Sequence, residues 1–406
     1  MLGEALFDGR SPPPPIRCTE NVNTSTEVSA SLEEESHNTM DFRKMIAFAG
    51  AAYFVVMTAI VVPVACVSTV VLLFPLIYLN LPLFNYLENH LCKLVNNHWV
   101  SASVHCGLNI VEYGCDIRAY AEKRCLFLAN HLGLIDHFVL MQSLHNKGRV
   151  PGNWMWVIYN IWKYTPLGVM WSAHGNFFIN GGKARKVALL SSFKKHLCNT
   201  FYKFDYRWIV MYPEGSRLFL IKDSCARFAE KIGLPALRHC GYPRTGAAHA
   251  VLDVLGPATS AQKLEAELDV ATSRCGAGPA VEYIIDATLG YPKGAVPNIG
   301  SAIVGEWPSS DGRVCVHYDV YKVDPEWANE TNLQAFLYKR YQAKDELLQQ
   351  FYTTNSFPGE ARPVVVSQLM MLLTEWIWIF LYYTHYTIWI RPLFSYMVSL
   401  AKGYFL

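Results

Sequence analysis

Residues 125–136 limit the possible fold more than any other stretch, because a buried-strand pattern runs directly into a polar turn. Cys125–Ala129 is a compact apolar run, typical of a buried strand in a parallel sheet. The apolar spacing over residues 138–144 then favours an amphipathic helix that starts near Asp136. Strand, turn and helix in this order predict an α/β fold. His131 and Asp136 would then lie at the carboxyl end of a strand, where open α/β sheets place their chemistry.

The spacing of His131 and Asp136 allows their side chains to meet across the turn. A carboxylate bonded to one imidazole nitrogen fixes the tautomer and leaves the other nitrogen free to take a proton. In the alternative interpretation Asp136 caps the helix and His131 is an ordinary loop histidine. On the first interpretation, His131 is a general base oriented by Asp136.

Composition points to membrane contact. Of the 406 residues, 52% are apolar and only 17% are charged, against about 25% charged in a typical soluble domain. The net charge of +2, from 35 basic and 33 acidic residues, argues against a nucleic-acid partner. The 11 cysteines show no C-x-x-C pair and no His/Cys zinc spacing. We therefore expect mostly buried, reduced thiols and no metal site.

The chain divides into five segments by composition and pattern. A disordered tail covers residues 1–42, and a membrane-anchoring segment with a connector covers 43–119. The catalytic α/β domain covers 120–320, followed by an amphipathic helix and linker at 321–362 and a C-terminal membrane segment at 363–406.

The uncharged run from Met45 to about Leu79 is long enough for one membrane span or for two short helices. Pro63 lies near its middle, so we favour a hairpin that folds back there within one leaflet. At the other end of the chain, Glu375 and Arg391 bound an apolar, aromatic stretch shorter than a full span. An anchor lying partly in the membrane interface is at least as well supported there as a clean span.

Alternating strand and helix patterns predict a mixed, mostly parallel sheet flanked by helices. Further strands are expected at 207–212, 281–286 and 314–320, with helices at 183–197, 224–231 and 333–351.

Four ordered stretches resemble the motifs of the glycerolipid acyltransferases. They are His131-x4-Asp136, Gly175–Ile179, Tyr212–Arg217 and Tyr242–Gly246. Further stretches, including 154–163 and 284–293, resemble the acyl-CoA:lysophosphatidylglycerol acyltransferase branch of that family. The resemblance runs from about residue 43 to the C-terminus.

This resemblance implies transfer of a long-chain acyl group from acyl-CoA to the free hydroxyl of a lysophospholipid. Acyl-CoA is then a co-substrate and no cofactor is expected; the lipid bilayer is a partner, and the endoplasmic reticulum membrane is the implied location. His131 would deprotonate the acceptor hydroxyl, with Asp136 stabilising the imidazolium. No G-x-S-x-G elbow supplies a serine nucleophile, so no acyl-enzyme is required.

The resemblance also implies a substrate-binding set. Arginine suits a phosphate because its planar fork binds two oxygens, although Glu214 and Arg217 could instead form a surface salt bridge, and Arg244 could be an ordinary surface arginine. Asn180 stands where relatives often carry a basic residue. Lys183, Arg185 and Lys186 follow soon after and could supply that charge, or they could form a solvated helix face. The expected substrate-binding residues are Glu214, Gly215, Ser216, Arg217, Gly175, Phe178, Ile179, Pro243 and Arg244.

Two alternatives to the acyl-CoA-dependent enzyme remain at this point. The same fold could serve a CoA-independent phospholipid transacylase, or a non-catalytic membrane scaffold. Lysophosphatidylglycerol and lysophosphatidylethanolamine are the acceptors that the resemblance favours. The sequence does not predict the acyl-chain preference or the oligomeric state.

Overall fold

The computed structural model describes residues 25–180, 185–259, 275 and 278–405. The chain forms two units, one up to Ile46 and one from Ala47 to Leu406. Helix α1, Ser25–Val67, begins in the first unit, so the boundary predicted at residue 43 falls inside a helix. Residues 1–24 of the predicted disordered tail lie outside the described residues. Every other element belongs to the second unit.

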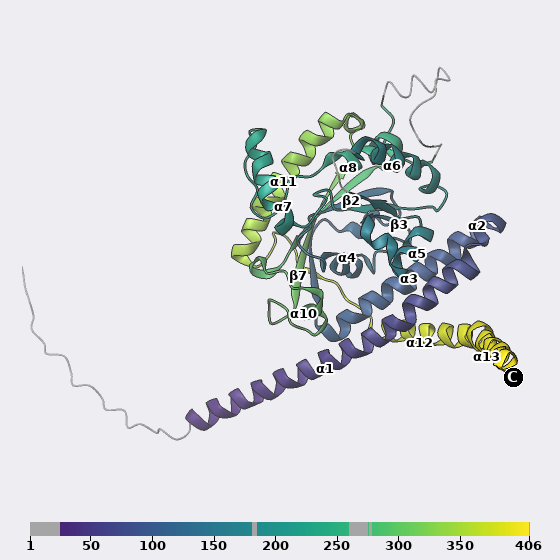
Figure 1. The fold of residues 1–406 in the computed structure, drawn as a ribbon. Coiled ribbons are helices and arrows are strands. Elements are labelled where there is room, and N and C mark those ends of the chain that lie inside the picture. Colours follow the sequence, from purple (N-terminus) through teal and green to yellow (C-terminus); the bar gives the residue numbers. More distant parts are fainter. Residues whose placement is uncertain (1–24, 181–184, 260–274, 276–277, 406) are drawn as a thin grey trace, which may run out of the picture. The chain divides into compact units, whose positions relative to one another are not determined.

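The second unit is built on one eight-stranded sheet with the order β4-β3-β5-β2-β6-β7-β1-β8 (Figure 1). Five neighbouring pairs are parallel, and only β6/β7 and β1/β8 are antiparallel. The predicted mixed, mostly parallel sheet is confirmed. The strands are β1 (Asn109–Gly114), β2 (Cys125–Ala129), β3 (Trp154–Tyr159), β4 (Phe177–Ile179), β5 (Trp208–Met211), β6 (Tyr283–Gly290), β7 (Arg313–Lys322) and β8 (Arg362–Pro363).

Helices cover both faces of the sheet because the apolar strands bury alternate residues on opposite sides. In β2, Phe127 packs with the core on the α4 side, whereas Leu126 and Leu128 pack with the core formed with α6, α8 and α11. The helices are α2 (Leu76–Leu79), α3 (Leu81–Cys106), α4 (Asp136–Leu144), α5 (Pro166–Ala173), α6 (Lys186–Thr200), α7 (Leu218–Lys231), α8 (Thr245–Leu255), α10 (Ile299–Ile303), α11 (Glu330–Thr354), α12 (Gln368–His385) and α13 (Arg391–Phe405), with η1 (Ser68–Leu73) a π-helix.

Parallel pairing places the carboxyl ends of β5, β2 and β6 at one edge of the sheet. Leu128 of β2 pairs with Met211 of β5, and Ala129 pairs with Ala287 of β6. The loops that follow these three strands therefore leave the sheet side by side.

Strands β1, β3 and β4 were not predicted, and the sheet extends beyond the domain boundaries predicted at residues 120 and 320. In β1 the interior carries a charge: Glu112 is buried against Lys147 Nζ at 2.7 Å and the hydroxyl of Tyr318 at 3.0 Å. A buried, paired carboxylate interrupts the apolar pattern that marks a core strand.

The prediction of a hairpin at Pro63 is wrong, because α1 continues through Pro63 and the chain reverses later, at Asn80. Met57 and Val61 pack on α3, and Thr58 bonds His98 of that helix at 3.0 Å. Neighbouring helices make an internal proline tolerable in an apolar helix. Among the described residues, only the stretch Lys44–Leu79 is long and apolar enough to cross a membrane.

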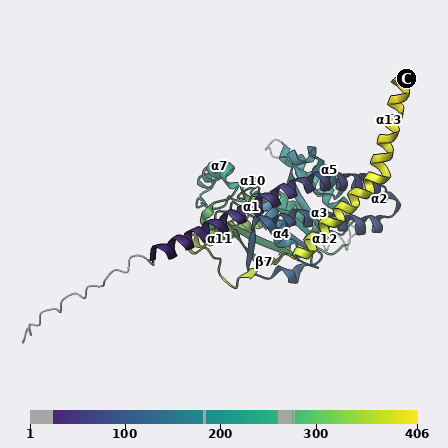
Figure 2. The same cartoon turned by 90° about the horizontal axis from the view of Figure 1, so that it is seen from below.

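Helix α12 packs against α3 (Figure 2), and buried polar side chains contribute to the contact. Glu375 accepts a 2.9 Å bond from His98, and Trp378 Nε1 lies 3.4 Å from the carbonyl of Leu94. Its opposite side exposes large apolar residues, Trp376 and Phe380 among them. This segment is not among the helices long and apolar enough to cross a membrane, so its predicted place in the membrane stays a prediction.

Helix α11 confirms the amphipathic pattern expected near residues 333–351, with one exception. Lys344, expected on the polar face, is buried and lies 2.7 Å from Asp286 of β6, with Arg340 at 3.3 Å from the same carboxylate. These pairs fasten α11 to the sheet, because a buried charge needs a partner of opposite sign.

A disulfide links Cys198 of α6 to Cys275, which corrects the expectation of reduced thiols for these two residues. The pair is 77 residues apart in the sequence, a separation at which spacing cannot identify partners. Eight other cysteines in the described residues are free thiols.

Candidate active site

The predicted pair meets directly after β2. His131 Nδ1 lies 2.9 Å from Asp136 Oδ2, and Asp136 has no exposed surface. An ionised carboxylate can only accept hydrogen bonds, so Nδ1 of His131 carries the hydrogen. No residue that the structure describes bonds Nε2 of His131, and the side chain keeps 18% of its surface exposed. Nε2 is therefore the free, basic nitrogen of an oriented imidazole.

The turn between β2 and α4 is closed by the same carboxylate. Asp136 Oδ2 also accepts the backbone N–H groups of Leu132 at 2.6 Å and Gly133 at 2.9 Å. Its other oxygen accepts the hydroxyl hydrogen of Tyr291, just past β6, at 2.7 Å. Four donors on one buried carboxylate fix its position.

The imidazole of His131 is also held from the side of β5. The ring of Tyr212 stacks on it at 4.2 Å between centroids. The carbonyl of His131 accepts the N–H of Leu218, the first residue of α7, at 2.8 Å. The loops after β2 and β5 are thus locked together around the base.

Glu214, in the third motif, connects the first motif with the residue that precedes the fourth. It is almost fully buried, and its two oxygens accept the backbone N–H groups of His131 and Gly241, each at 3.0 Å. The structure therefore brings Glu214 to the site through the backbone. Its predicted contact with a substrate stays a prediction.

Burial raises the pKa of Glu214 to about 8, although the two backbone N–H groups oppose the shift. A folded pKa above the usual value means that this group stabilises the fold fully below about pH 4.5, and that this contribution is lost as the pH rises through about 8. We expect the melting temperature of the wild type to fall over this range through Glu214. Glu214→Gln cannot titrate, so it should melt lower at pH 5 and show a flatter pH profile. A melting-temperature difference between the two proteins that stays constant from pH 5 to 8 would contradict this assignment.

Two arginines lie at the same edge without an ion-pair partner among the described residues. Arg217 precedes α7 and is half-buried, with its guanidinium 5.0 Å from the ring of Phe219. Arg244 precedes α8 and is exposed, and its side chain covers Gly215, where an added Cβ would come within 3.2 Å of Arg244 Cδ. Gly215 has φ +74°, a conformation that favours glycine. The pair forms a positively charged rim beside His131 suited to an anion.

The remaining predicted residues fall into two groups. Pro243 is buried just before Arg244, whose N–H bonds the carbonyl of Pro213 at 2.7 Å, and Ser216 lies half-buried between Gly215 and Arg217. The second motif forms the edge strand β4, with Phe178 and Ile179 half-buried at its carboxyl end. Gly175 lies at the opposite end, against Phe204 and Tyr206, so the structure does not bring it to His131.

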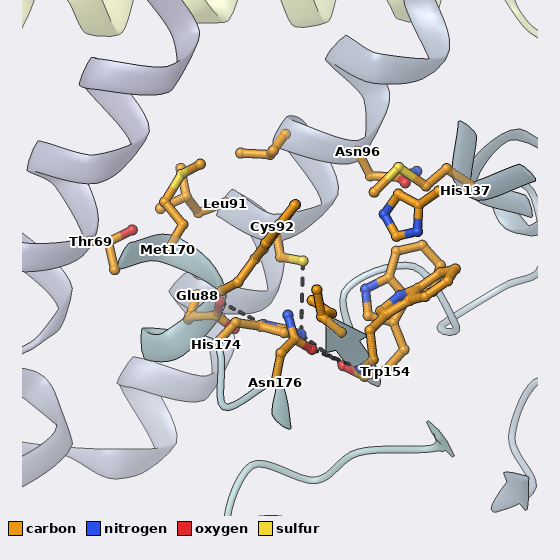
Figure 3. A pocket seen from close by; sticks show the side chains of 15 residues that line it. Thr69, Glu88, Leu91, Cys92, Asn96, His137, Trp154, Met170, His174 and Asn176 are labelled. Atoms are coloured by element: carbon orange, nitrogen blue, oxygen red, sulfur yellow. Dashed lines mark hydrogen bonds and ion pairs between the residues drawn. The ribbon is translucent and has the colours of Figure 1, made fainter. Parts of the chain in front are cut away.

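A pocket lies between α3, α4, β3 and α5 (Figure 3), and His137, the residue after Asp136, is the lining residue nearest to the catalytic pair in the chain. Its empty volume is about 560 Å³, part of it open to solvent, and most of its lining is apolar. His137, which follows Asp136, lines it and packs on the ring of Trp156 at 4.4 Å. Burial, with the nearby His131, lowers the pKa of His137 to about 4. His137 is therefore a neutral imidazole at neutral pH.

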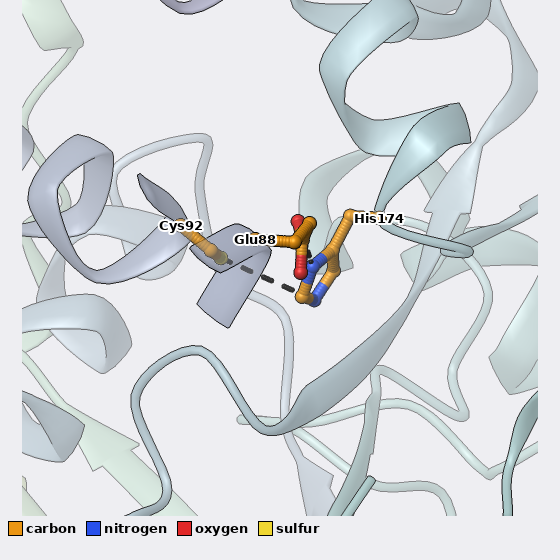
Figure 4. Close-up of side chains that lie close together, drawn as sticks. All are labelled: Glu88, Cys92 and His174. Atoms are coloured by element: carbon orange, nitrogen blue, oxygen red, sulfur yellow. Dashed lines mark hydrogen bonds and ion pairs between the residues drawn. The ribbon is translucent and has the colours of Figure 1, made fainter. Parts of the chain in front are cut away.

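At another side of the pocket, Glu88, Cys92 and His174 gather within the reach of one metal ion (Figure 4). Both nitrogens of His174 are already engaged, by Glu88 at 2.7 Å and by the carbonyl of Trp154 at 2.7 Å. A carbonyl only accepts, so Nε2 is protonated. Burial disfavours the charge, but Cys92 and Glu88 raise the pKa of His174 well above its usual value. The cluster is an ion pair whose histidine has no lone pair for a metal.

Sequence reasoning missed Tyr291, Tyr212 and Asn130 as site residues. Asn130 bonds both backbone groups of Leu289 in β6, at 2.7 and 3.1 Å, and so sets the start of the catalytic turn. Position was the available signal for two of them, because Asn130 follows and Tyr212 ends a predicted strand. Tyr291 lies beyond the strand predicted at 281–286, because β6 continues to Gly290.

Comparison with known proteins agrees with this geometry. An acyltransferase family model matches residues 111–260, and an acyltransferase C-terminus model matches residues 313–378. A Caenorhabditis elegans protein provisionally named 1-acyl-sn-glycerol-3-phosphate acyltransferase acl-12 is 54% identical over 90% of this chain and 92% of that protein. The human and mouse proteins named acyl-CoA:lysophosphatidylglycerol acyltransferase 1 are each 32% identical over 81% of this chain and 88% of their own length.

The two family models cover most strands of the sheet, the four motif stretches and α11. The chain therefore belongs to the glycerolipid acyltransferase family, near the acyl-CoA:lysophosphatidylglycerol acyltransferase branch.

Proposed function

We propose that this acyltransferase moves a long-chain acyl group from acyl-CoA to the free hydroxyl of a lysophospholipid, with lysophosphatidylglycerol and lysophosphatidylethanolamine as the favoured acceptors. The observation that carries the proposal is the free Nε2 of His131, oriented through Nδ1 by a buried Asp136 at 2.9 Å. A hydroxyl is a weak nucleophile, and a positioned base is what it needs to attack a thioester. The name of the human relative supports acyl-CoA as the donor and lysophosphatidylglycerol as an acceptor.

The reaction proceeds without a covalent enzyme intermediate. Nε2 of His131 takes the proton of the acceptor hydroxyl while the oxygen forms a bond to the thioester carbonyl carbon. Asp136 stabilises the imidazolium that results. When the tetrahedral intermediate collapses, the carbon–sulfur bond breaks and the imidazolium returns the proton to the leaving sulfur. The products are free CoA and the diacyl phospholipid.

The two arginines beside the base hold phosphate. Arg217 lies one residue from Leu218, whose N–H bonds His131, so its guanidinium is placed for the phosphate of the acceptor. Arg244 is more exposed and suits a phosphate of CoA or of the headgroup. Glu214 supports both by fixing the loops from which they project.

The enzyme works at a bilayer, which we place in the endoplasmic reticulum. Lys44–Leu79 anchors the chain, and α12 with α13 forms a second anchor that presents tyrosine and tryptophan side chains to the headgroup zone. An anchored enzyme can accept both substrates without drawing their chains into water.

The experiment that tests the proposal offers purified enzyme in lipid vesicles one long-chain acyl-CoA and a panel of lysophospholipids, lysophosphatidate included, with products read by mass spectrometry. We expect a diacyl product from lysophosphatidylglycerol or lysophosphatidylethanolamine only when acyl-CoA is added. Equal product without acyl-CoA would identify a transacylase. No product from any acceptor, with folded protein, would favour a scaffold.

Tyr291→Phe tests the support beneath the base. The variant removes the hydroxyl that donates to Asp136 Oδ1 at 2.7 Å. Loss of a hydrogen bond to a charged group should lower kcat/KM by roughly 10- to 100-fold. Tyr206→Phe is the matched control, because that buried hydroxyl has no partner among the described residues. Equal effects of the two variants would show that the Tyr291 bond does not position Asp136.

A further inference from the structure

The pocket lined by His137 contains buried polar groups in addition to its apolar wall. Leu91, Val95, Ile158 and Met170 form much of its wall. Thr69 brings the wall up to η1, within the membrane-anchoring stretch. A pocket of this kind accepts a lipid chain from the bilayer side, yet it also contains an asparagine and a tryptophan N–H.

Near Glu88 the polar groups are satisfied. His174 bonds Glu88 and the carbonyl of Trp154. Asn176 Oδ1 accepts the backbone N–H of Trp156 at 2.8 Å. These bonds are internal to the protein and need no ligand.

Close to His137 the polar groups are not satisfied. Asn96 is 2% exposed, and neither atom of its amide has a hydrogen-bond partner in the part of the chain that the structure describes. The same holds for Nε1 of Trp156, whose ring packs on His137. Asn96 and His137 both line the pocket and are labelled in Figure 3. Buried polar atoms without partners are costly, so three of them in one pocket, two of which are N–H donors, indicate a ligand that pairs with them.

Asn97, the next residue on α3, provides the contrast. It is equally buried, but its amide lies 3.4 Å from Thr374 of α12 and 3.3 Å from His145. Helix geometry turns Asn97 away from the pocket and Asn96 into it. Asn97 is therefore a structural residue, whereas Asn96 has no hydrogen-bond partner among the described residues.

We propose that Asn96 Nδ2 and Trp156 Nε1 hold the ester carbonyl of the acyl chain that the lysophospholipid already carries. This inference rests on the proposed function. A carbonyl oxygen accepts two hydrogen bonds, which matches the two donors. In a lysophospholipid that ester is attached to the carbon next to the one bearing the free hydroxyl. His137, which lines this side of the pocket, directly follows Asp136 at the start of α4, so we place the ester here and the free hydroxyl of the same acceptor at His131.

The consequence is selection between ester- and ether-linked acceptors. An O-alkyl lysophospholipid has the same chain and headgroup but no carbonyl, and it leaves both donors unpaired. The test compares ester- and ether-linked lysophosphatidylglycerol, with the chain on either glycerol carbon, in wild type, Asn96→Leu, Trp156→Phe and Asn97→Leu. We expect wild type to favour the ester by roughly tenfold in kcat/KM. The difference should lie mainly in KM, because the ester is bound in both ground and transition states.

The variants should separate as follows. Asn96→Leu should use the ester no better than the ether and should melt at or above the wild-type temperature, because it removes an unpaired buried amide. Trp156→Phe should lose part of the preference. Asn97→Leu should keep the preference and melt lower, because it breaks two contacts.

Equal use of ester and ether by the wild type would overturn the inference without needing any variant. So would an undiminished ester preference in folded Asn96→Leu. Both results leave acyl transfer itself intact, which distinguishes them from failure of the proposed function, where neither linkage is acylated.

Discussion

Replacing His131 by alanine is expected to lower the acyl-transfer rate by about 10²- to 10⁴-fold, the usual contribution of a general base. The variant removes Nε2, the one nitrogen placed to take the acceptor proton, and leaves the pocket and both arginines in place. Stability should change little, because Asp136 keeps three other hydrogen-bond donors. The measurement is kcat at saturating acyl-CoA and acceptor, together with the melting temperature.

His90→Ala is the matched control for this prediction. His90 is exposed on α3 and bonds only a carbonyl of its own helix, Tyr86, at 2.7 Å. It should retain wild-type activity. A His131→Ala enzyme within a few-fold of wild type would remove His131 from the mechanism.

Asp136→Asn is expected to have an effect of similar size, about 10³- to 10⁴-fold in kcat, by analogy with the serine-protease triad. The amide has nearly the same shape as the carboxylate, but it carries no charge to stabilise the imidazolium. Its oxygen can still face the three N–H groups that Asp136 Oδ2 accepts, with the amide nitrogen towards Tyr291. KM should therefore change much less than kcat.

A charge-removing variant elsewhere separates catalysis from general electrostatics. Asp253 of α8 pairs with Lys194 at 2.6 Å, so Asp253→Asn removes an ion pair at a position that does not contact His131. It should lower kcat by no more than a few-fold. If Asp136→Asn and Asp253→Asn were equally active, the carboxylate of Asp136 would have no catalytic role.

Local patterns predicted the strand, turn and helix around His131, because periodicity and spacing act over a few residues. The meeting of His131 and Asp136 follows from a turn that is itself short. The bond from Tyr291 joins residues 155 apart, and the bond from Glu214 to the His131 backbone joins residues 83 apart. Such contacts depend on the order of strands in the sheet, which spacing alone does not specify.

The wrong predictions share a cause of the same kind. Pro63 continues a helix because packing on α3 overrides its local preference to break one. Lys344 is buried because Asp286 lies opposite it on β6, a partner that a helical pattern cannot reveal. The bond between Cys198 and Cys275 likewise joins residues far apart in the sequence. In each case tertiary contacts decide against the local signal.

The most direct test of the account mixes the purified enzyme with acyl-CoA that carries an isotope-labelled chain, alone and together with lysophosphatidylglycerol. Free CoA thiol and labelled phospholipid are followed over time, and the protein is examined for a covalent label. We predict that both products appear in equal amounts, only when the acceptor is present, and that the protein stays unlabelled. Release of CoA without the acceptor, together with a labelled protein, would contradict His131 as a base acting directly on the acceptor hydroxyl.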